Sequence, residues 1–170
     1  MNKTTIIAIL FLVTMAIFPF LVDSAWLSIG ITFLVFAVVA FSQDIILGRA
    51  GIFNMGHAIF FGIGAYTTAI LNVHFGFEII ATVPFAIILP IIISILLAGP
   101  IIHLRGDYLL VATIGFNIIF EQVLKNNVFD VTGGPSGIFG IDVVRIFGYE
   151  LYSDTAIYYI AFGLLLITLF

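Results

Sequence analysis

The amino-acid sequence predicts an all-α, polytopic membrane protein with about six transmembrane spans, the last of them incomplete. Composition is the first reason: 63% of the residues are hydrophobic and 8% are charged, whereas soluble domains carry about 25% charged residues. The second reason is that the apolar runs are long and nearly free of charge, as a hydrocarbon layer about 30 Å thick requires. One transmembrane domain is expected over residues 1–170.

The first two predicted spans are Thr4 to Val22 and Ala25 to Gln43. The first span has no charge, and Pro19 stands near its end, where a broken helix costs little. Residues 1–26 also resemble a signal peptide with a small-residue cleavage site. Because further apolar spans follow at once, the membrane class does not depend on whether this start is removed.

The third predicted span, Gly51 to Val73, is rich in glycine and contains Asn54 and His57. Small residues spaced three or four apart let a second helix approach closely, so this helix is predicted to be central in its bundle. The predicted helix-packing seam consists of Ala58, Gly62, Ala65 and Ala69.

The remaining predicted spans are Ile79 to Ile102, Tyr108 to Leu124 and Ala156 to Phe170. The fourth contains three prolines, which kink a membrane helix and free backbone carbonyls for other partners. The sixth reaches only about 22 Å at 1.5 Å per residue. It is therefore expected to end inside the bilayer, as in a fragment of a longer chain.

The long connection from Lys125 to Thr155 contains TGGPSG, in which glycine and proline predict turns. Residues 125–155 are predicted to form an extracytoplasmic loop. Alternation of the spans places three basic residues together on the opposite side: Lys3, Arg49 and Arg105. Because these lie in short segments, the positive-inside rule places the N-terminus in the cytoplasm.

Polar residues recur at every fourth position of the fifth span and form one stripe: Thr113, Asn117, Glu121 and Lys125. A charge at the bilayer centre costs at least roughly 2.5 to 3.5 kcal/mol, so the stripe must face protein or water. Asn117 is expected near the midplane. For Glu121, an ion pair with Lys125 and a role in a substrate pathway both remain open.

His57 should lie at the depth of Thr113 if the third and fifth helices run parallel, about 9 Å into the membrane. A hydrogen bond across a helix interface is preferred there to ligand or proton chemistry. Five residues are candidates for a substrate pathway: Asn117, Thr113, Glu121, Asn54 and His57.

Several kinds of chemistry find no support in the sequence. No G-x-x-x-x-G-K-[ST] motif occurs, so the chain is not expected to bind ATP itself. The absence of cysteine removes thiolate sites, three scattered histidines predict no metal site, and no basic patch suggests nucleic acid. Catalysis is not expected either, because the single intramembrane acid, Glu121, has no acidic partner at matching depth.

Two segments together resemble a known family: LGRAGIFNMGHAIFFGIGAYTTAIL (Leu47 to Leu71) and LRGDYLLVATIGFNIIFEQVLKNNVFDVTGGPSGI (Leu104 to Ile138). They are similar to the permease subunits of branched-chain amino acid ABC transporters, in particular the member of the permease pair with the R-G-D-Y and T-G-G-P-x-G-I signatures. The chain would then be the N-terminal portion of such a permease, in the cytoplasmic (inner) membrane of a bacterium or archaeon.

The resemblance implies an importer of hydrophobic amino acids with several other subunits. These are a paralogous permease, two cytoplasmic ATPase subunits that bind ATP, and an extracytoplasmic substrate-binding protein. The binding protein would face the loop residues Gly133, Gly134, Pro135 and Gly137. The chain departs from the family pattern in the fifth span, where Ile118 and Glu121 stand in place of a usual Glu and Arg.

Other functions stay open at this point. Related systems of the same fold import urea or amides. An ion-coupled secondary transporter would use Glu121 as its proton or cation site. A structural membrane partner without transport activity is a third possibility, favoured if 170 residues are the whole natural product.

Overall fold

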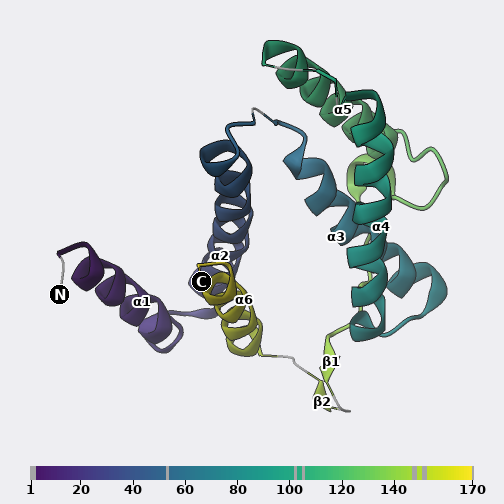
Figure 1. Cartoon of the computed structure of the whole chain (residues 1–170). Helices are drawn as coiled ribbons and strands as arrows, with labels where there is room; N and C mark the ends of the chain where they lie inside the picture. The colour runs from purple at the N-terminus through teal and green to yellow at the C-terminus, as the bar shows by residue number, and fades with distance from the viewer. Residues whose placement is uncertain are drawn as a thin grey trace. The chain divides into compact units, whose positions relative to one another are not determined.

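The computed structural model describes residues 3–52, 54–101, 103–104, 106–146, 149–150 and 153–169. Ile102 and Phe170, which end predicted spans, and Arg105, one of the basic residues used to predict the orientation, lie outside the described residues. Figure 1 shows the helices: α1 (Lys3–Leu21), α2 (Ser24–Asp44), α3 (His57–Phe75), α4 (Ile79–Ile101), α5 (Asp107–Lys125) and α6 (Asp154–Leu169). The predicted all-α class is confirmed.

Shorter elements complete the described part of the chain. A π-helix covers Ile45–Arg49 and a 3-10 helix covers Gly134–Ser136. Two-residue strands β1 (Arg145–Ile146) and β2 (Tyr149–Glu150) pair antiparallel.

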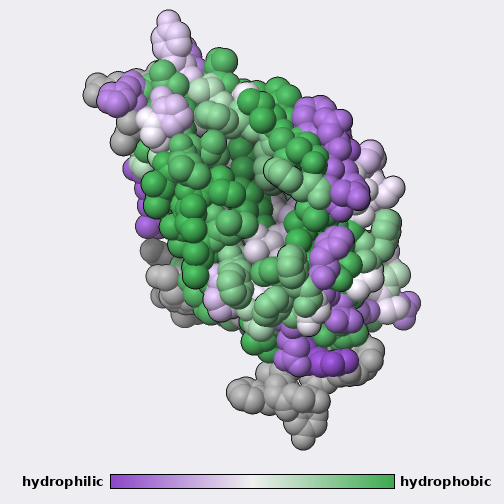
Figure 2. All heavy atoms as spheres, turned by 90° about the vertical axis from the view of Figure 1, so that its right-hand side faces the viewer, coloured by the Kyte–Doolittle hydropathy of each residue, from purple (hydrophilic) through white to green (hydrophobic). Residues whose placement is uncertain are grey.

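Among the described residues, four helical stretches are long and apolar enough to cross a membrane: Ser24–Arg49, His57–Phe75, Ile79–Ile101 and Asp107–Lys125. Shorter apolar helices cover Leu10–Leu21 and Asp154–Leu169. On the face in Figure 2, hydrophobic residues cover most of the surface and hydrophilic residues gather along one margin and at the ends. The protein is therefore a multi-pass membrane protein.

The chain divides into two compact units. The first combines Met1–Ser42 with Leu151–Phe170, and so contains α1, most of α2 and α6. Its core lies among these helices and consists of Leu27, Leu34, Tyr158, Ala161, Phe162 and Leu165.

Pro19 and Tyr158 explain how α1 and α6 are joined in the first unit. Proline has no N–H, so the carbonyl of Met15, four residues earlier, loses its helical donor. The Tyr158 hydroxyl donates to this carbonyl at 2.9 Å, and the Phe18 and Tyr158 rings stack with their centroids 5.9 Å apart. The helix break expected at Pro19 thus becomes an interhelical contact.

The second unit, Gln43–Glu150, contains α3, α4 and α5. Gly76 adopts a φ of +67° and ends α3, and α4 begins three residues later. A Cβ on Gly64 of α3 would lie 3.4 Å from the carbonyl oxygen of Ala86 in α4. Pro90 deprives that carbonyl of its helical donor, so here too a freed carbonyl faces a neighbouring helix.

Candidate functional site

The chain leaves helical geometry between α2 and α3. The π-helix ends at Arg49, Gly51 has a φ of +64°, and α3 begins only at His57. The prediction that the third span begins at Gly51 is therefore wrong. The physical reason is an Asx turn, in which the Asn54 side-chain oxygen accepts from the Gly56 N–H at 2.7 Å and competes with helix formation.

Side chains from α2 and α5 satisfy the backbone of this break. Gln43 donates through Nε2 to the Asn54 carbonyl at 2.7 Å. The Met55 N–H donates to the Thr113 hydroxyl at 3.1 Å, and that hydroxyl donates to the Leu110 carbonyl at 2.9 Å. Non-helical backbone at membrane depth requires such protein partners or water. We call this group the polar junction: Gln43, Asn54, Gly56, His57 and Thr113.

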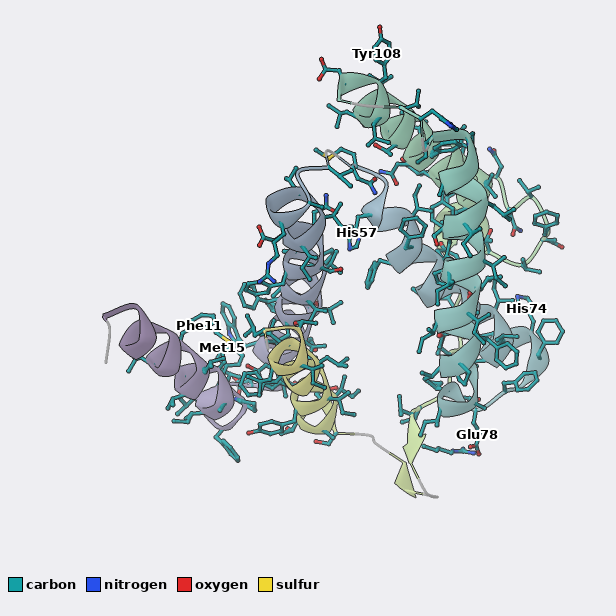
Figure 3. All side chains as sticks on the ribbon, viewed as in Figure 1. Phe11, Met15, His57, His74, Glu78 and Tyr108 are labelled. Carbon is teal, nitrogen blue, oxygen red and sulfur yellow. The ribbon has the colours of Figure 1, made fainter. Side chains whose placement is uncertain are left out.

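Two buried atoms of the polar junction have no partner among the described residues: Gln43 Oε1 and His57 Nδ1. Buried polar atoms are nearly always hydrogen-bonded, so a water or a polar group of a ligand is the expected occupant beside them. The interhelical hydrogen bond expected of His57 is not made by its Nδ1. Figure 3 shows His57 at the first turn of α3.

α3 and α5 run side by side in the same direction, as the depth argument for His57 and Thr113 required. A Cβ on Gly56 would lie 3.6 Å from Thr113 Cβ, and one on Gly62 would lie 2.8 Å from Phe120 Cε1. The two contacts are six residues apart on α3 and seven residues apart on α5, in the same chain direction.

The polar stripe of α5 is divided between two environments. Thr113 is buried in the polar junction, and Asn117 is half-buried. Glu121 instead forms an ion pair with Lys125, and both side chains are more than half exposed, at 56% and 54%. Of the five pathway candidates, Asn54 and Thr113 both bond to the backbone of the break, at Gly56 and at Met55. His57 follows Gly56 directly in the chain. Glu121 lies apart from them, in its ion pair with Lys125.

The predicted packing seam of α3 has mixed surroundings. Gly62 faces Phe120 of α5 and Ala69 is buried, whereas Ala58 and Ala65 are exposed. The close approach of α4 occurs at Gly64, outside the predicted set.

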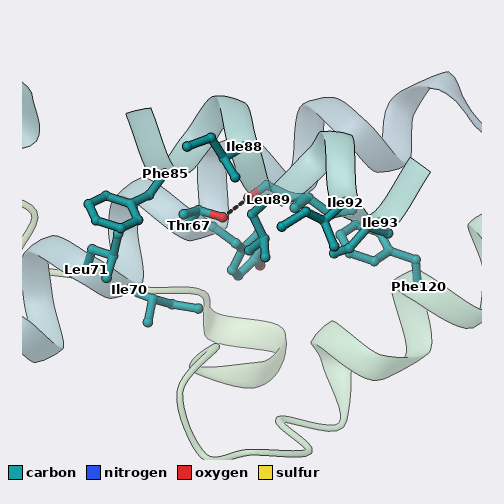
Figure 4. A pocket seen from close by; sticks show the side chains of 11 residues that line it. Thr67, Ile70, Leu71, Phe85, Ile88, Leu89, Ile92, Ile93 and Phe120 are labelled. Atoms are coloured by element: carbon teal, nitrogen blue, oxygen red, sulfur yellow. Dashed lines mark hydrogen bonds between the residues drawn. The ribbon is translucent and has the colours of Figure 1, made fainter. Parts of the chain in front are cut away.

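An apolar cavity of about 480 Å³ lies between α3 and α4 (Figure 4). Thr67 and Tyr66 are the lining residues with hydroxyl groups. The Thr67 hydroxyl donates to the Ile63 carbonyl at 2.7 Å and is thereby satisfied. The cavity offers hydrophobic contact without charge. Its lining residues are Ile63, Tyr66, Thr67, Ile70, Leu71, Phe85, Ile88, Leu89, Ile92, Ile93 and Phe120.

Sequence reasoning missed this cavity and Gln43. The signal for the cavity was present in α4, where Phe85, Ile88, Leu89 and Ile92 follow helical spacing on one face. Gln43 is the last residue of the second predicted span, so it was interpreted only as the end of that span. Among the described residues, no group of three or more His, Asp or Glu side chains could hold a metal ion.

Apolar helices long enough to cross a membrane, a non-helical break held by polar side chains and an uncharged cavity are features of helical membrane transport proteins. The family model described as "Branched-chain amino acid transport system / permease component" matches residues 25–170. The chain belongs to this family of transport permeases.

Two curated relatives are named high-affinity branched-chain amino acid transport system permease protein LivM. The chain is 33% identical to the Escherichia coli protein over 154 residues, which cover 91% of this chain and 36% of the relative. It is 33% identical to the Salmonella typhimurium protein over 144 residues, covering 85% and 34%. The chain thus spans about a third of the length of these relatives. No solved structure matches it significantly.

Proposed function

We propose that the chain forms part of the permease subunit of an ABC importer that moves branched-chain amino acids across the inner membrane of a bacterium or archaeon. The observation that carries this proposal is the family match over residues 25–170. The two LivM relatives, named as branched-chain amino acid permeases, support the same substrate class.

The geometry of the second unit suits an amino acid with an aliphatic side chain. The cavity between α3 and α4 would take the side chain, since its lining carries no charged residue. Burial of a leucine-sized group stabilises binding by about 1.5–3 kcal/mol. The polar junction, at the start of α3, would contact the charged groups of the substrate: Gln43 Oε1 can accept from an ammonium group.

No covalent chemistry on the substrate is part of this proposal. ATP would bind to two separate cytoplasmic ATPase subunits, and a paralogous permease would complete the membrane domain. An extracytoplasmic binding protein would deliver the substrate. The permease itself would provide alternating access to the site.

Uptake of radiolabelled leucine by cells with the complete transporter tests the proposal. The variant Leu89→Trp fills the cavity, because Leu89 is one of its lining residues. We expect the KM for leucine uptake to rise by roughly 10-fold or more, as loss of a burial worth about 1.5–3 kcal/mol requires.

Leu96→Trp is the matched control on the same helix, because Leu96 is 69% exposed and lies outside the cavity lining. It should leave the KM unchanged. If the two variants transport leucine equally well, the cavity is not the side-chain site. Failure of the unaltered transporter to take up leucine, isoleucine or valine, with uptake of urea or an amide instead, would refute the proposed substrate.

A further inference from the structure

A second, smaller cavity of about 220 Å³ lies where α3 and α5 end. We call it the terminal pocket, because its walls come from the last turn of α3 and from the connection that follows α5. Among the described residues, none lines both this pocket and the cavity between α3 and α4. The lining of the terminal pocket consists of Val73, His74, Asn127, Asp130, Val131, Gly133, Gly137, Ile138 and Phe139.

Hydrogen bonds within the connection hold the walls of the terminal pocket. The Asn127 side-chain oxygen accepts from the Thr132 N–H at 2.8 Å, and the Thr132 hydroxyl donates to the Leu124 carbonyl at 2.8 Å. Asn127 and Asp130 have positive φ, 49° and 55°, a conformation that asparagine and aspartate tolerate better than most side chains. The connection is therefore ordered around the pocket by its own contacts.

The terminal pocket contains hydrogen-bond acceptors. The His74 ring, labelled at the end of α3 in Figure 3, bonds to the Val131 carbonyl through Nε2 at 3.2 Å. A carbonyl only accepts, so Nε2 carries the hydrogen and Nδ1 of the neutral ring is an acceptor. The Asp130 carboxylate accepts from Asn127 Nδ2 through Oδ1 at 2.8 Å. Its Oδ2 has no partner among the described residues.

The charges around the terminal pocket favour a cation. Its described lining contains one acidic side chain, Asp130, and no lysine or arginine. Val73 and His74 belong to the last turn of α3, and Asn127 is the second residue after α5. Helix C-termini carry a partial negative charge, so two of them add to the effect of the carboxylate. An ammonium group is the small organic cation that such acceptors fit.

The lining also contains free backbone donors and apolar side chains. Within the described part of the chain, no hydrogen bond engages the N–H groups of Gly133, Ile138 and Phe139. Such N–H groups can donate to a carboxylate, and hydrogen bonds to an ionised group are roughly twice as strong as neutral ones. Val73 and Val131 add aliphatic surface to that of Ile138 and Phe139.

Acceptors, donors and apolar surface in one small pocket match the groups of an aliphatic α-amino acid. Its ammonium group only donates hydrogen bonds, and its carboxylate only accepts them. A volume of about 220 Å³ equals roughly seven water molecules at about 30 Å³ each. This space suits a molecule of the size of valine or leucine.

We propose that the terminal pocket is a second binding site for aliphatic amino acids, separate from the cavity between α3 and α4. Asp130 and His74 Nδ1 accept from the ammonium group, and free N–H groups such as that of Ile138 donate to the carboxylate. Val73 and Phe139 contact the side chain. The choice of aliphatic amino acids rests on the proposed function, whereas the preference for an ammonium group rests on the pocket alone.

Protection of a single thiol tests the site, because the chain has no cysteine of its own. In the assembled transporter, Val73→Cys places a thiol in the pocket lining. Leucine at about ten times its Kd should slow the labelling of this thiol by a hydrophilic maleimide by roughly 10-fold, as occupancy of one site requires.

Val128→Cys is the matched control, since Val128 is a valine of the connection that is 56% exposed and lies outside the lining. Its labelling should not respond to leucine. Phe139→Cys, 76% exposed and in the lining, serves as the reporter if Val73→Cys is unreactive. Equal effects of leucine on the lining and control thiols, or no effect on the lining thiol, overturn the proposal.

Asp130→Asn tests the recognition of the ammonium group. Asparagine keeps an acceptor for Asn127 and tolerates positive φ, but it removes the charge. The leucine concentration that gives half-maximal protection of Val73→Cys should rise roughly 10-fold or more, as loss of a charged hydrogen bond requires. Asp142→Asn makes the same change in the connection outside the lining and should leave this concentration unchanged. Equal shifts in the two variants contradict the role of Asp130.

Two analogues of leucine separate its charges. Isoamylamine lacks the carboxylate and should protect Val73→Cys, with loss of this protection in Asp130→Asn. Isocaproate lacks the amino group and should protect more weakly than the amine; the reverse order contradicts the assignment. Protection requires no transport. Leucine uptake without protection therefore contradicts the terminal pocket alone, and protection without uptake contradicts the proposed function alone.

Discussion

Thr113 carries the hydrogen bonds that let the chain leave helical geometry between α2 and α3. Its hydroxyl accepts from the Met55 N–H at 3.1 Å and donates to the Leu110 carbonyl at 2.9 Å. The side chain is 3% exposed, so water cannot replace it as the partner of Met55. The position of the break therefore depends on a residue more than fifty positions away in the sequence.

Thr113→Val should destabilise the protein, because valine has the same shape but leaves the Met55 N–H unsatisfied. The expected loss is about 1–3 kcal/mol of unfolding free energy, the usual cost of a buried unpaired donor. Denaturant titration of the protein in detergent micelles would measure it. Thr113→Ser retains the hydroxyl and should lose markedly less; equal losses for the two variants would show that the hydroxyl does not support the break.

Single residues were predictable where their partners are close in sequence. A spacing of four on one helix made the ion pair of Glu121 with Lys125 one of two roles left open for Glu121, and the structure shows this pair. The contact of Thr113 with the Asn54 region required the relative position of two helices. Depth counting placed His57 and Thr113 at one level, and the structure brings Gly56, the residue before His57, beside Thr113. It could not identify Gln43 as the donor to Asn54.

At the scale of elements, backbone carbonyls that lose their helical hydrogen-bond donor to a proline form contacts with neighbouring helices. Pro19 removes the helical donor of the Met15 carbonyl, and Tyr158 of α6 supplies another at 2.9 Å. Tyr158 is fully buried, and its ring also stacks on Phe18. The contact thus combines apolar packing with one interhelical hydrogen bond.

A double-mutant cycle should reveal the coupling of Pro19 with Tyr158. Tyr158→Phe should cost about 0.6 kcal/mol and at most about 1.7 kcal/mol, the mean and the maximum found for hydrogen bonds between membrane helices. In a Pro19→Ala background, residue 19 regains an N–H for the Met15 carbonyl, so the same substitution should cost less. Unfolding in detergent micelles measures both. Equal costs in the two backgrounds would mean that the tyrosine stabilises the unit by packing alone.

The helices themselves were predictable because hydropathy and length determine them in a bilayer. The six predicted spans match the six helices, with ends that differ by one to a few residues apart from the start of α3. The break before α3 was hidden because GIFNMG is part of an apolar run. The turns predicted from TGGPSG are present, since Gly133, Gly134 and Gly137 all have positive φ. The path of the connection beside α3 was not predictable, because it depends on tertiary contacts such as the hydrogen bond of Asn72 with Asp142.

At the scale of the molecule, charge is too sparse to suggest ion coupling. The sequence has nine acids and five bases in 170 residues, and the acid in the fifth span already has a basic partner in Lys125. An ion-coupled carrier that used Glu121 would need its protonation or cation binding to change during transport. An ABC permease needs none, because its ATPase subunits supply the energy.

Glu121→Gln in the complete transporter therefore distinguishes the two sources of energy. Both partners of the Glu121–Lys125 pair are more than half exposed, and such pairs contribute about 0–1 kcal/mol, so the variant should fold and retain most leucine uptake. Lys125→Gln, which breaks the same pair from the other side, is the control and should behave alike. Inactivation of the ATPase subunits should abolish uptake in every variant. Uptake that is lost in Glu121→Gln, kept in Lys125→Gln and indifferent to the ATPases would instead identify an ion-coupled carrier.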